Sequence, residues 1–355
     1  MTRAGPKNQG DRMGSNGLHY PFEHRPAPGQ LVEVASGVYW VRMPLPISLN
    51  HINLWVLEEA DGWTIVDTGM ATDETKMLWE TIIDRYLDGK PIKNVIATHM
   101  HFDHLGLAGW LVENFGATLW MSRTEYLASR VLINEISEEP PVDTVEFFRK
   151  AGVEEAALSE FKERFRARKQ FVSALPTKFN RLVDNQTVDI GAHRWKVVIG
   201  EGHSPEHVCL VCESLNIFIA GDQILPRISA NIGVRTVEPH SNPLHDWLAS
   251  CEKFLAFLNP EVMVLPSHGD PFIGAHTRIR EFIDEHQVNL KKLQQYCAEP
   301  RSVVDTFPIL FKSTINSGNI VIAVMEATAH LNYLVFAGSL AASTRADGIT
   351  TYQVR

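Results

Sequence analysis

Four side chains that can bind a metal lie within six residues, in the stretch His99-Met-His-Phe-Asp-His104. They directly follow Val95-Ile-Ala-Thr98, which reads as a buried strand, so a turn after this strand can point all four at one spot. Histidine nitrogen and carboxylate oxygen are the ligands that divalent ions such as zinc prefer. A loop of surface histidines, the alternative, explains neither the spacing nor the apolar strand before it. The stretch therefore predicts a metal site.

Three later segments offer the further ligands that a metal cage needs. His203 lies in a Gly-His-Ser-Pro-Glu-His segment, Asp222 ends an Ile-Ala-Gly-Asp segment, and His268 lies in a Pro-Ser-His-Gly segment. Each segment follows an apolar run and is flanked by Gly or Pro. Any one of these residues alone would more often be structural than a ligand. Together with the first cluster they indicate one shared site.

The four segments together resemble the metallo-β-lactamase superfamily. The His-x-His-x-Asp-His motif is complete, the later His, Asp and His occur in the family's order, and the resemblance covers roughly residues 30 to 275. It implies a binuclear site for two divalent metal ions, with Zn2+ as the first choice and Fe or Mn as alternatives. The ligands that it implies are His99, His101 and His203 for one ion, Asp103, His104 and His268 for the other, and Asp222 between them.

The resemblance also implies roles for residues around the ligands. Asp67, at the end of a Thr-Ile-Val-Asp strand, matches an early family Asp that orients ligands without binding the metal. His207 follows His203 by four positions, and we interpret it as a structural hydrogen bonder beside the site. Family members with di-iron redox chemistry tend to carry an acid where this chain has His101. The histidine there favours hydrolysis.

A cage of this kind predicts a hydrolase. Two ions that share a water lower its pKa from about 15.7 towards neutrality, which provides hydroxide as the nucleophile, and a metal also polarises the attacked carbonyl or phosphoryl oxygen. We expect Asp103 to be the catalytic residue that orients this hydroxide. The leading expectation is cleavage of a small ester, thioester or lactone. Alternatives are an endoribonuclease or phosphodiesterase, a mono-iron sulfur dioxygenase, and a binding protein that keeps the cage as a structural or sensing site.

Alternating strands and helices are expected to position these residues. The segment 30–67 reads as short antiparallel strands, 72–86 as an amphipathic helix, and 94–97 as the apolar strand before the first cluster. A helix at 105–115, a strand at 117–121 and the start of another helix at 122–130 follow the first cluster, and further strands are expected at 187–190, 194–199, 207–212, 217–220 and 262–265. Two halves that each begin with strands and continue with helices predict an α/β fold, an αββα sandwich of the metallo-β-lactamase type.

The interval between His104 and His203 spans 99 positions, which departs from compact members of the family. Charged helical runs at 142–150 and 154–169 predict a helical insertion at about 132–184, which we interpret as a lid. Its neighbourhood contains aromatic residues that line either a pocket or a core: Tyr126, Phe147, Phe148 and Phe165. The loop after Asp222 is a second pocket wall, and its predicted substrate contacts are Arg227, Ser229 and Asn231.

A separate C-terminal module is expected at 276–355, after a catalytic domain at 30–275. An amphipathic helix at 276–296, an apolar helix around 319–337 and a hairpin at 340–354 resemble the winged-helix-like extension of β-lactamase-like hydrolases, which include some endoribonucleases. Eight Lys and Arg against seven Asp and Glu give this module a net charge of 8 − 7 = +1. Such a module offers no basic face for nucleic acid. We expect it to serve packing or homodimer formation.

The bulk composition agrees with an enzyme that acts on a small-molecule substrate. The chain has 355 residues, of which 45% are hydrophobic, and a formal charge of −9, which speaks against nucleic acid as the main partner. No uninterrupted apolar run approaches the roughly 18 residues of a membrane span. Residues 1–29 lack the apolar centre of a secretory signal and read as an N-terminal tail. Four cysteines make no disulfide framework, which fits a cytoplasmic location.

Overall fold

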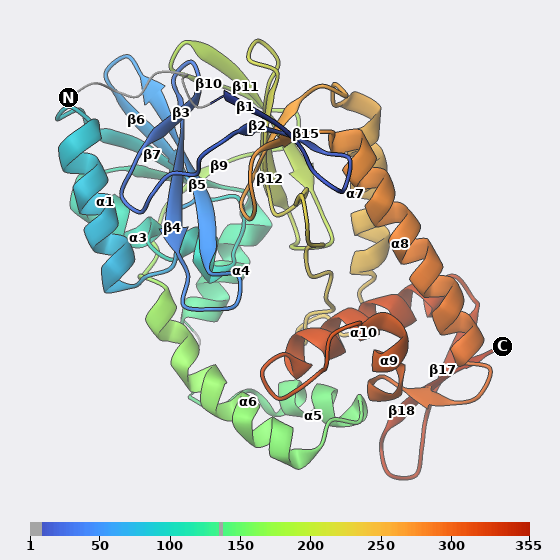
Figure 1. Ribbon diagram of the computed structural model, residues 1–355. Helices are drawn as coiled ribbons and strands as arrows, with labels where there is room; N and C mark the ends of the chain where they lie inside the picture. Colours follow the sequence, from blue (N-terminus) through green and yellow to red (C-terminus); the bar gives the residue numbers. More distant parts are fainter. Residues whose placement is uncertain (1–8, 135–137) are drawn as a thin grey trace.

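Two β-sheets packed face to face form the centre of the structure, a computed structural model that describes residues 9–134 and 138–355 (Figure 1). The first sheet pairs its strands in sequence order from β3 to β9, antiparallel up to β6 and parallel from β6 to β9. Its strands are β3 (Val32–Ala35), β4 (Val38–Pro44), β5 (His51–Glu59), β6 (Gly62–Val66), β7 (Ile92–Ile96), β8 (Thr118–Met121) and β9 (Asn180–Arg181).

The second sheet has eight strands in the order β1-β2-β15-β14-β13-β12-β11-β10. Within it, β13 and β14 pair in parallel, and the remaining pairs are antiparallel. The strands are β1 (Gln9–Met13), β2 (His19–Phe22), β10 (Thr187–Ile190), β11 (His193–Gly200), β12 (His207–Cys212), β13 (Ile217–Gly221), β14 (Met263–Pro266) and β15 (Phe272–Ile273).

Helices cover the outer faces of both sheets, which confirms the expected αββα sandwich. On the first sheet, α1 (Asp73–Tyr86) and α3 (Ala108–Phe115) bury Trp79 and Leu111 in one core. On the second sheet, α7 (Pro243–Phe257) and α8 (Ala275–Tyr296) bury Trp247 and Ile279 in another. The helix α7 was missed at the sequence level, although Asn242 and Pro243 begin it as N-cap and first-turn residue.

The core between the sheets follows from the period of two along each strand. On β4, Trp40 points into the inter-sheet core, whereas Tyr39 and Val41 point to the helical side. Trp40 stacks on Trp55 of the paired strand with ring centroids 6.3 Å apart. The same alternation sends Cys209 and Cys212 of β12 to opposite cores, as expected, and both thiols are free.

The N-terminal segment corrects the expectation of a tail over residues 1–29. From Gln9 onward the chain forms β1 and β2, and β2 pairs with β15 at the edge of the second sheet. Leu18 and Tyr20 are fully buried there. The residue pattern contains little sign of these strands, because few large apolar residues anchor the segment and backbone pairing with an edge strand supplies the rest.

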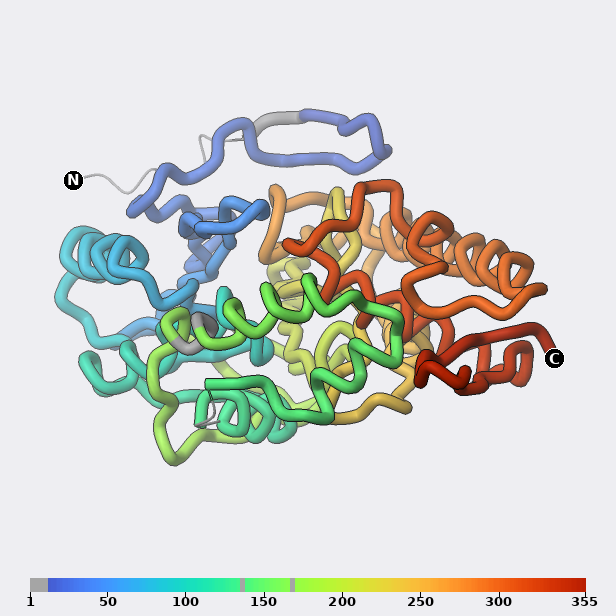
Figure 2. Tube along the Cα trace, turned by 90° about the horizontal axis from the view of Figure 1, so that it is seen from below, coloured from blue at the N-terminus to red at the C-terminus, as the bar shows by residue number. Residues whose placement is uncertain are grey.

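The insertion and the C-terminal module lie side by side (Figures 1 and 2). The helices of the insertion pack into the core of the second sheet together with apolar residues of the module: Phe148, Val303 and Val324 belong to the same cluster of buried residues. The backbone N–H of Val304 donates to the carbonyl of Ala151. The insertion contains α5 (Val142–Lys150), α6 (Glu155–Ala167) and the 3-10 turn η1 (Arg168–Phe171), after α4 (Arg123–Asn134).

The C-terminal module continues from α8 with two helices and a small sheet. These elements are β16 (Arg301–Ser302), η2 (Val304–Thr306), α9 (Phe307–Leu310), α10 (Ile320–Phe336), β17 (Leu340–Thr344) and β18 (Thr350–Val354). The module thus has the helices and the hairpin that the sequence predicted. Among the described residues, every helix is too short or too polar to cross a membrane.

Candidate metal centre

All seven predicted ligands gather at one edge of the sandwich, in loops that follow four strands. His99 to His104 follow β7 and include the short helix α2 (Phe102–Leu105), while His203, Asp222 and His268 follow β11, β13 and β14. Two groups result, and within each group the potential ligand atoms lie within 4.8 Å of one another: His99, His101, His203 and Asp222 in the first, Asp103, His104 and His268 in the second.

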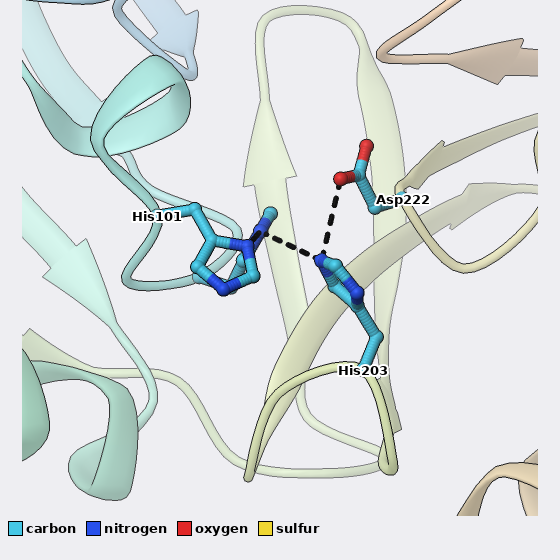
Figure 3. A group of neighbouring side chains, drawn as sticks. His101, His203 and Asp222 are labelled. Carbon is cyan, nitrogen blue, oxygen red and sulfur yellow. Dashed lines mark hydrogen bonds and ion pairs between the residues drawn. The ribbon is translucent and has the colours of Figure 1, made fainter. Parts of the chain in front are cut away.

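The first group has the spacing of ligands around one ion. His99 Nε2 lies 2.8 Å from His101 Nδ1 and 3.2 Å from His203 Nε2. His203 Nε2 also lies 3.3 Å from Asp222 Oδ2, so that His203 stands between His101 and Asp222 (Figure 3). Nitrogen ligands about 2.0–2.1 Å from a tetrahedral zinc ion lie about 3.3 Å apart. The first group therefore fits a small divalent cation.

The second group shares Asp222 with the first. His268 Nε2 lies 3.3 Å from Asp103 Oδ2 and 3.5 Å from Asp222 Oδ1, and His104 Nε2 lies 3.5 Å from Asp222 Oδ2. In the described part of the chain, His104 Nε2 and Asp222 Oδ1 are buried without a hydrogen-bond partner. Buried polar atoms rarely stay unpaired in native proteins. A cation bound between the two groups would give both atoms a partner.

Electrostatics in the first group keeps the imidazoles of His99 and His101 neutral. Burial, together with the charges of the neighbouring histidines, holds the pKa of His99 well below its usual range. Burial and the charge of His203 do the same to the pKa of His101. A neutral imidazole keeps the lone pair that a metal needs.

The second group concentrates negative charge instead. Burial opposes the ionisation of Asp103, yet His104 and His268 lower its pKa to about 2. Burial likewise opposes a charge on His104, but Asp222, Asp103 and Asp67 raise the pKa of that imidazole well above its ordinary value. Buried carboxylates in this number require a compensating cation. Asp222 and Asp103 also raise the pKa of His268 against the effect of burial. A divalent ion would supply the compensating charge in place of these protonated histidines.

Hydrogen bonds from the protein orient three of the ligands. His104 Nδ1 lies 2.7 Å from Asp67 Oδ2, and Asp67 also accepts from the Thr98 backbone at 2.7 Å. Asp67 thus lies where the sequence placed an orienting residue. His268 Nδ1 donates to the carbonyl of His51 at 2.9 Å, and His203 Nδ1 donates to the carbonyl of Asn231 at 2.8 Å. Each N–H fixes the tautomer that leaves Nε2 free for a metal.

His207 lies behind the first group. Its Nε2 accepts from the backbone N–H of Asp222 at 3.1 Å, and its ring stacks on His99 at 4.6 Å. Burial lowers the pKa of His207 to about 3, so it serves as a neutral acceptor. Gly221 leaves room for this ring, because a Cβ there would lie 2.2 Å from His207 Cε1.

Sequence reasoning missed two supporting residues, Glu125 and His51. Glu125 of α4 is fully buried, and its carboxylate accepts from the backbone N–H groups of Met100 at 3.0 Å and Glu206 at 2.9 Å. It therefore holds two ligand loops together. His51 Nε2 accepts from the N–H of Gly269 at 2.9 Å. An acid in an amphipathic helix and a histidine at the start of a strand carry no local signal for these roles.

The predicted substrate contacts have other neighbours. Arg227 and Ser229 are exposed; the Arg227 guanidinium lies 5.9 Å from the Tyr20 ring, and the Ser229 hydroxyl donates to the Ala230 carbonyl. Within the described residues, neither side chain bonds to the ligands. Asn231 does contact the centre, but through its backbone carbonyl, which accepts from His203 Nδ1.

The aromatic residues near the insertion divide by burial. Tyr126 and Phe148 are 6% and 2% exposed, which favours core packing over a pocket lining. Tyr126 also stacks on Phe179 and donates its hydroxyl to the carbonyl of Pro176 at 2.7 Å. Phe147 and Phe165 are half-buried, and their rings contact Phe148 and Phe161, respectively.

Comparison with protein families gives two adjoining matches. Residues 48–268 match the model of the Metallo-beta-lactamase superfamily, and residues 290–355 match the Metallo-beta-lactamase-like, C-terminal domain. The first match spans the whole ligand set from His99 to His268.

Individual relatives cover most of the chain. The Probable metallo-hydrolase YqjP of Bacillus subtilis is 22% identical over 304 residues, which is 83% of this chain and 91% of that protein. The Acyl-coenzyme A thioesterase MBLAC2 of Homo sapiens is 23% identical over 257 residues, 70% of this chain and 83% of that protein.

Solved structures share the fold over nearly the full length. A Beta-lactamase domain protein from Burkholderia ambifaria is 39% identical, with a TM-score of 0.88 over 95% of this chain and 98% of that one. The metallo-beta-lactamase family protein TTHA1429 from Thermus thermophilus is 24% identical, with a TM-score of 0.75 over 91% of this chain and 100% of that one.

Proposed function

The chain belongs to the metallo-β-lactamase superfamily and is a metal-dependent hydrolase, and from this premise we propose that it holds two divalent ions and cleaves a small ester, thioester or lactone. The observation that carries the proposal is the pair of ligand groups that meet at Asp222. Divalent ions in such a site supply a water of nearly neutral pKa as the nucleophile and polarise the attacked carbonyl oxygen.

We assign the ligands from the types and positions of the donor atoms. His99, His101 and His203 would hold one ion, Asp103, His104 and His268 the other, and Asp222 would contact both. A set of imidazole nitrogens and carboxylate oxygens suits zinc, with iron and manganese as alternatives.

Asp103 is our candidate catalytic residue. Its side chain is 15% exposed, against 9% for Asp222 and 4% for His268, so it lies on the open side of the centre. Its low pKa keeps the carboxylate ionised and able to accept a hydrogen bond. Accepting that bond from the attacking water would align the water with the carbonyl carbon.

The cysteines of this chain are poor candidates for a nucleophile, which favours attack by water. All four are buried free thiols. Burial raises the pKa of Cys209 well above its ordinary value and that of Cys251 to about 12, so neither forms the reactive thiolate. Among acyl substrates, a thioester is the first to test, because the relative MBLAC2 carries the name of an acyl-coenzyme A thioesterase.

The test combines metal analysis with a substrate panel. Protein freed of metal by a chelator and reloaded with Zn2+ is assayed against acyl thioesters, esters and lactones. We expect two ions per chain, chelator-sensitive thioester hydrolysis, and a kcat about 100-fold lower in Asp103→Asn, while the exposed control Asp143→Asn keeps the wild-type rate. Two bound zinc ions without turnover of any acyl substrate would contradict the proposal.

The alternatives predict different results in the same samples. One iron per chain with oxygen uptake would favour a sulfur dioxygenase. Salt-sensitive binding and cleavage of RNA would favour a phosphodiesterase. A binding protein would take up metal and turn over none of these substrates.

A further inference from the structure

The backbone carbonyl of Asn231, which orients His203, belongs to a segment without regular secondary structure. Asn231 lies between β13 and α7, in a stretch free of helix and strand from Arg227 to Arg235. Its carbonyl accepts the Nδ1–H of His203 at 2.8 Å. Because no ladder of backbone hydrogen bonds fixes this segment, contacts with other elements must set the position of the carbonyl.

Those contacts come from the C-terminal helices. Arg278 of α8 donates to the carbonyl of Leu225, just before the segment, at 2.8 Å and to that of Ile228, near its start, at 3.1 Å. Beyond Asn231, the backbone N–H of Val234 donates to the carbonyl of Met325 in α10 at 3.0 Å.

The closest link to the ligand runs through a side chain of α10. Asn231 Nδ2 donates to Glu326 Oε2 at 2.9 Å. The same asparagine thus bonds to the candidate ligand His203 with its backbone carbonyl and to the C-terminal module with its side-chain amide. Gly233 packs beside this contact, and a Cβ there would lie only 3.0 Å from Met325 Cβ. The close approach keeps the segment against α10.

We propose that Glu326 of the C-terminal module is a positioning residue for the metal ligand His203 and acts through Asn231. On this view the module is a part of the metal centre, since it sets the direction of one imidazole. The inference rests on the proposed metal site. Residues that orient metal ligands typically change metal affinity about 10- to 100-fold when they are removed.

A conservative variant separates positioning from charge. Burial raises the pKa of Glu326 to about 7, with the hydrogen bond from Asn231 opposing the shift. The ionised and the protonated carboxyl group both offer an acceptor oxygen, and the amide of glutamine offers one too. Glu326→Gln should therefore preserve the link, whereas Glu326→Leu removes it at similar volume.

The experiment measures zinc affinity of the full-length, metal-free protein by competition with a chromophoric chelator. Wild type should bind two ions, Glu326→Leu should bind one of them at least about 10-fold more weakly, and Glu326→Gln should stay within about twofold. The matched control is Asn332→Ala, because Asn332 of α10 donates to the carbonyls of Pro239 and Ser241 and has no bond to a ligand. Its zinc affinity should equal that of wild type.

Asn231→Ala provides the second arm and keeps the test decisive if Glu326→Leu does not fold. This variant removes the side-chain amide and leaves the backbone carbonyl, so it should weaken the binding of the same ion. The double variant Asn231→Ala with Glu326→Leu should bind that ion no more weakly than either single variant. Wild-type affinity in Asn231→Ala or in folded Glu326→Leu, or an equal loss in Asn332→Ala, would overturn the inference. Wild-type protein that binds no zinc would instead defeat the proposed function itself.

Discussion

At the scale of single residues, Glu125 connects two of the candidate ligand loops without being a ligand itself. Its two carboxylate oxygens accept one backbone N–H from the first ligand loop and one from the loop of His203. Glutamine has the same shape but only one acceptor, and its NH2 group would face a backbone donor. We expect Glu125→Gln to lower the free energy of unfolding by about 1–3 kcal/mol, the cost of one unpaired buried donor.

Chemical denaturation of the metal-free protein measures this loss, and zinc competition measures its effect on the site. The control is Glu113→Gln, since Glu113 is an exposed acid on α3 and should leave both quantities unchanged. If Glu125→Gln were as stable as wild type and bound zinc equally well, the two loops would not depend on this carboxylate.

A second residue, Arg235, is a candidate contact for an anionic group of the substrate. Its charge acts to lower the pKa of both His101 and Glu125, so it lies near the centre, and its half-buried guanidinium has no hydrogen bond or ion pair among the described residues. A free guanidinium there would attract a carboxylate or phosphate group of a substrate. We predict that Arg235→Gln raises KM about 10-fold or more for thioesters with an anionic group.

Steady-state kinetics with paired substrates checks this prediction. An uncharged thioester of similar size is the control substrate, and its KM should change by less than about twofold in Arg235→Gln. Equal effects on charged and uncharged substrates would mean that Arg235 supports the fold of its loop and leaves the substrate untouched.

The seven candidate ligands could be named from the sequence because their types are rare together and each follows a strand. The supporting residues could not, because their roles depend on tertiary neighbours. Glu125 is an ordinary helix acid until α4 packs against the ligand loops. Asn231 was predicted as a substrate contact from its loop, yet its amide bonds to Glu326, 95 positions further along the chain.

At the scale of elements, α8 and α10 are joined by a buried histidine pair. His286 Nδ1 lies 3.1 Å from His330 Nε2, and burial together with the charge of His330 lowers the pKa of His286 to about 3. The native state thus keeps His286 neutral, whereas the unfolded chain binds a proton near pH 6.5. Stability from this group is complete above about pH 6.5 and falls by about 1.4 kcal/mol per pH unit as the pH decreases towards 3.

The variant His286→Gln removes this titration and retains a hydrogen-bonding side chain. Unfolding of the metal-free protein between pH 7 and pH 4 should therefore show a shallower loss of stability in the variant than in wild type. His240→Gln, at an exposed position of the same region, should reproduce the wild-type slope. Parallel curves for wild type and His286→Gln would show that the unfolded state gains no proton at this residue.

Most elements could be predicted from hydrophobic periodicity, since long helices such as α1 and α8 and the apolar strands β7 and β13 have clear patterns. The strands β1 and β2 could not, because they are stabilised by backbone pairing, of β1 with β2 and of β2 with β15, rather than by alternation. The insertion was recognised as helical, but the core that it shares with α10 was not predicted. Its Phe148 and Leu158 share a core with Val324 and Leu331 of α10.

At the scale of the whole molecule, bound metal should stabilise the fold. Buried carboxylates and unpaired atoms such as His104 Nε2 destabilise the metal-free native state. An ion that binds only the native state raises the free energy of unfolding by about 4 kcal/mol when its concentration is about 1,000 times Kd. We expect a chelator to lower Tm by several degrees and added Zn2+ to restore it. An unchanged Tm would mean that the centre is not loaded under these conditions.

The shared core predicts how far the chain can be shortened. Residues of the second sheet, the insertion, α8 and α10 bury one another in a single cluster, which includes Phe218, Phe148, Ile279 and Leu331. A chain that ends at Gly274 would expose this cluster and lose the supports of the Asn231 segment. We expect such a chain to aggregate or to show no cooperative unfolding, although it retains every candidate metal ligand.

The matched comparison is a chain that ends at Gly338, which loses only the hairpin of β17 and β18. Because this chain keeps α8 and α10 against the second sheet, it should still unfold cooperatively, with a lower Tm than the full-length protein. Thermal unfolding and light scattering of both shortened chains measure the difference. A soluble, cooperatively folding chain that ends at Gly274 and binds two zinc ions would show that the catalytic part is independent of the module.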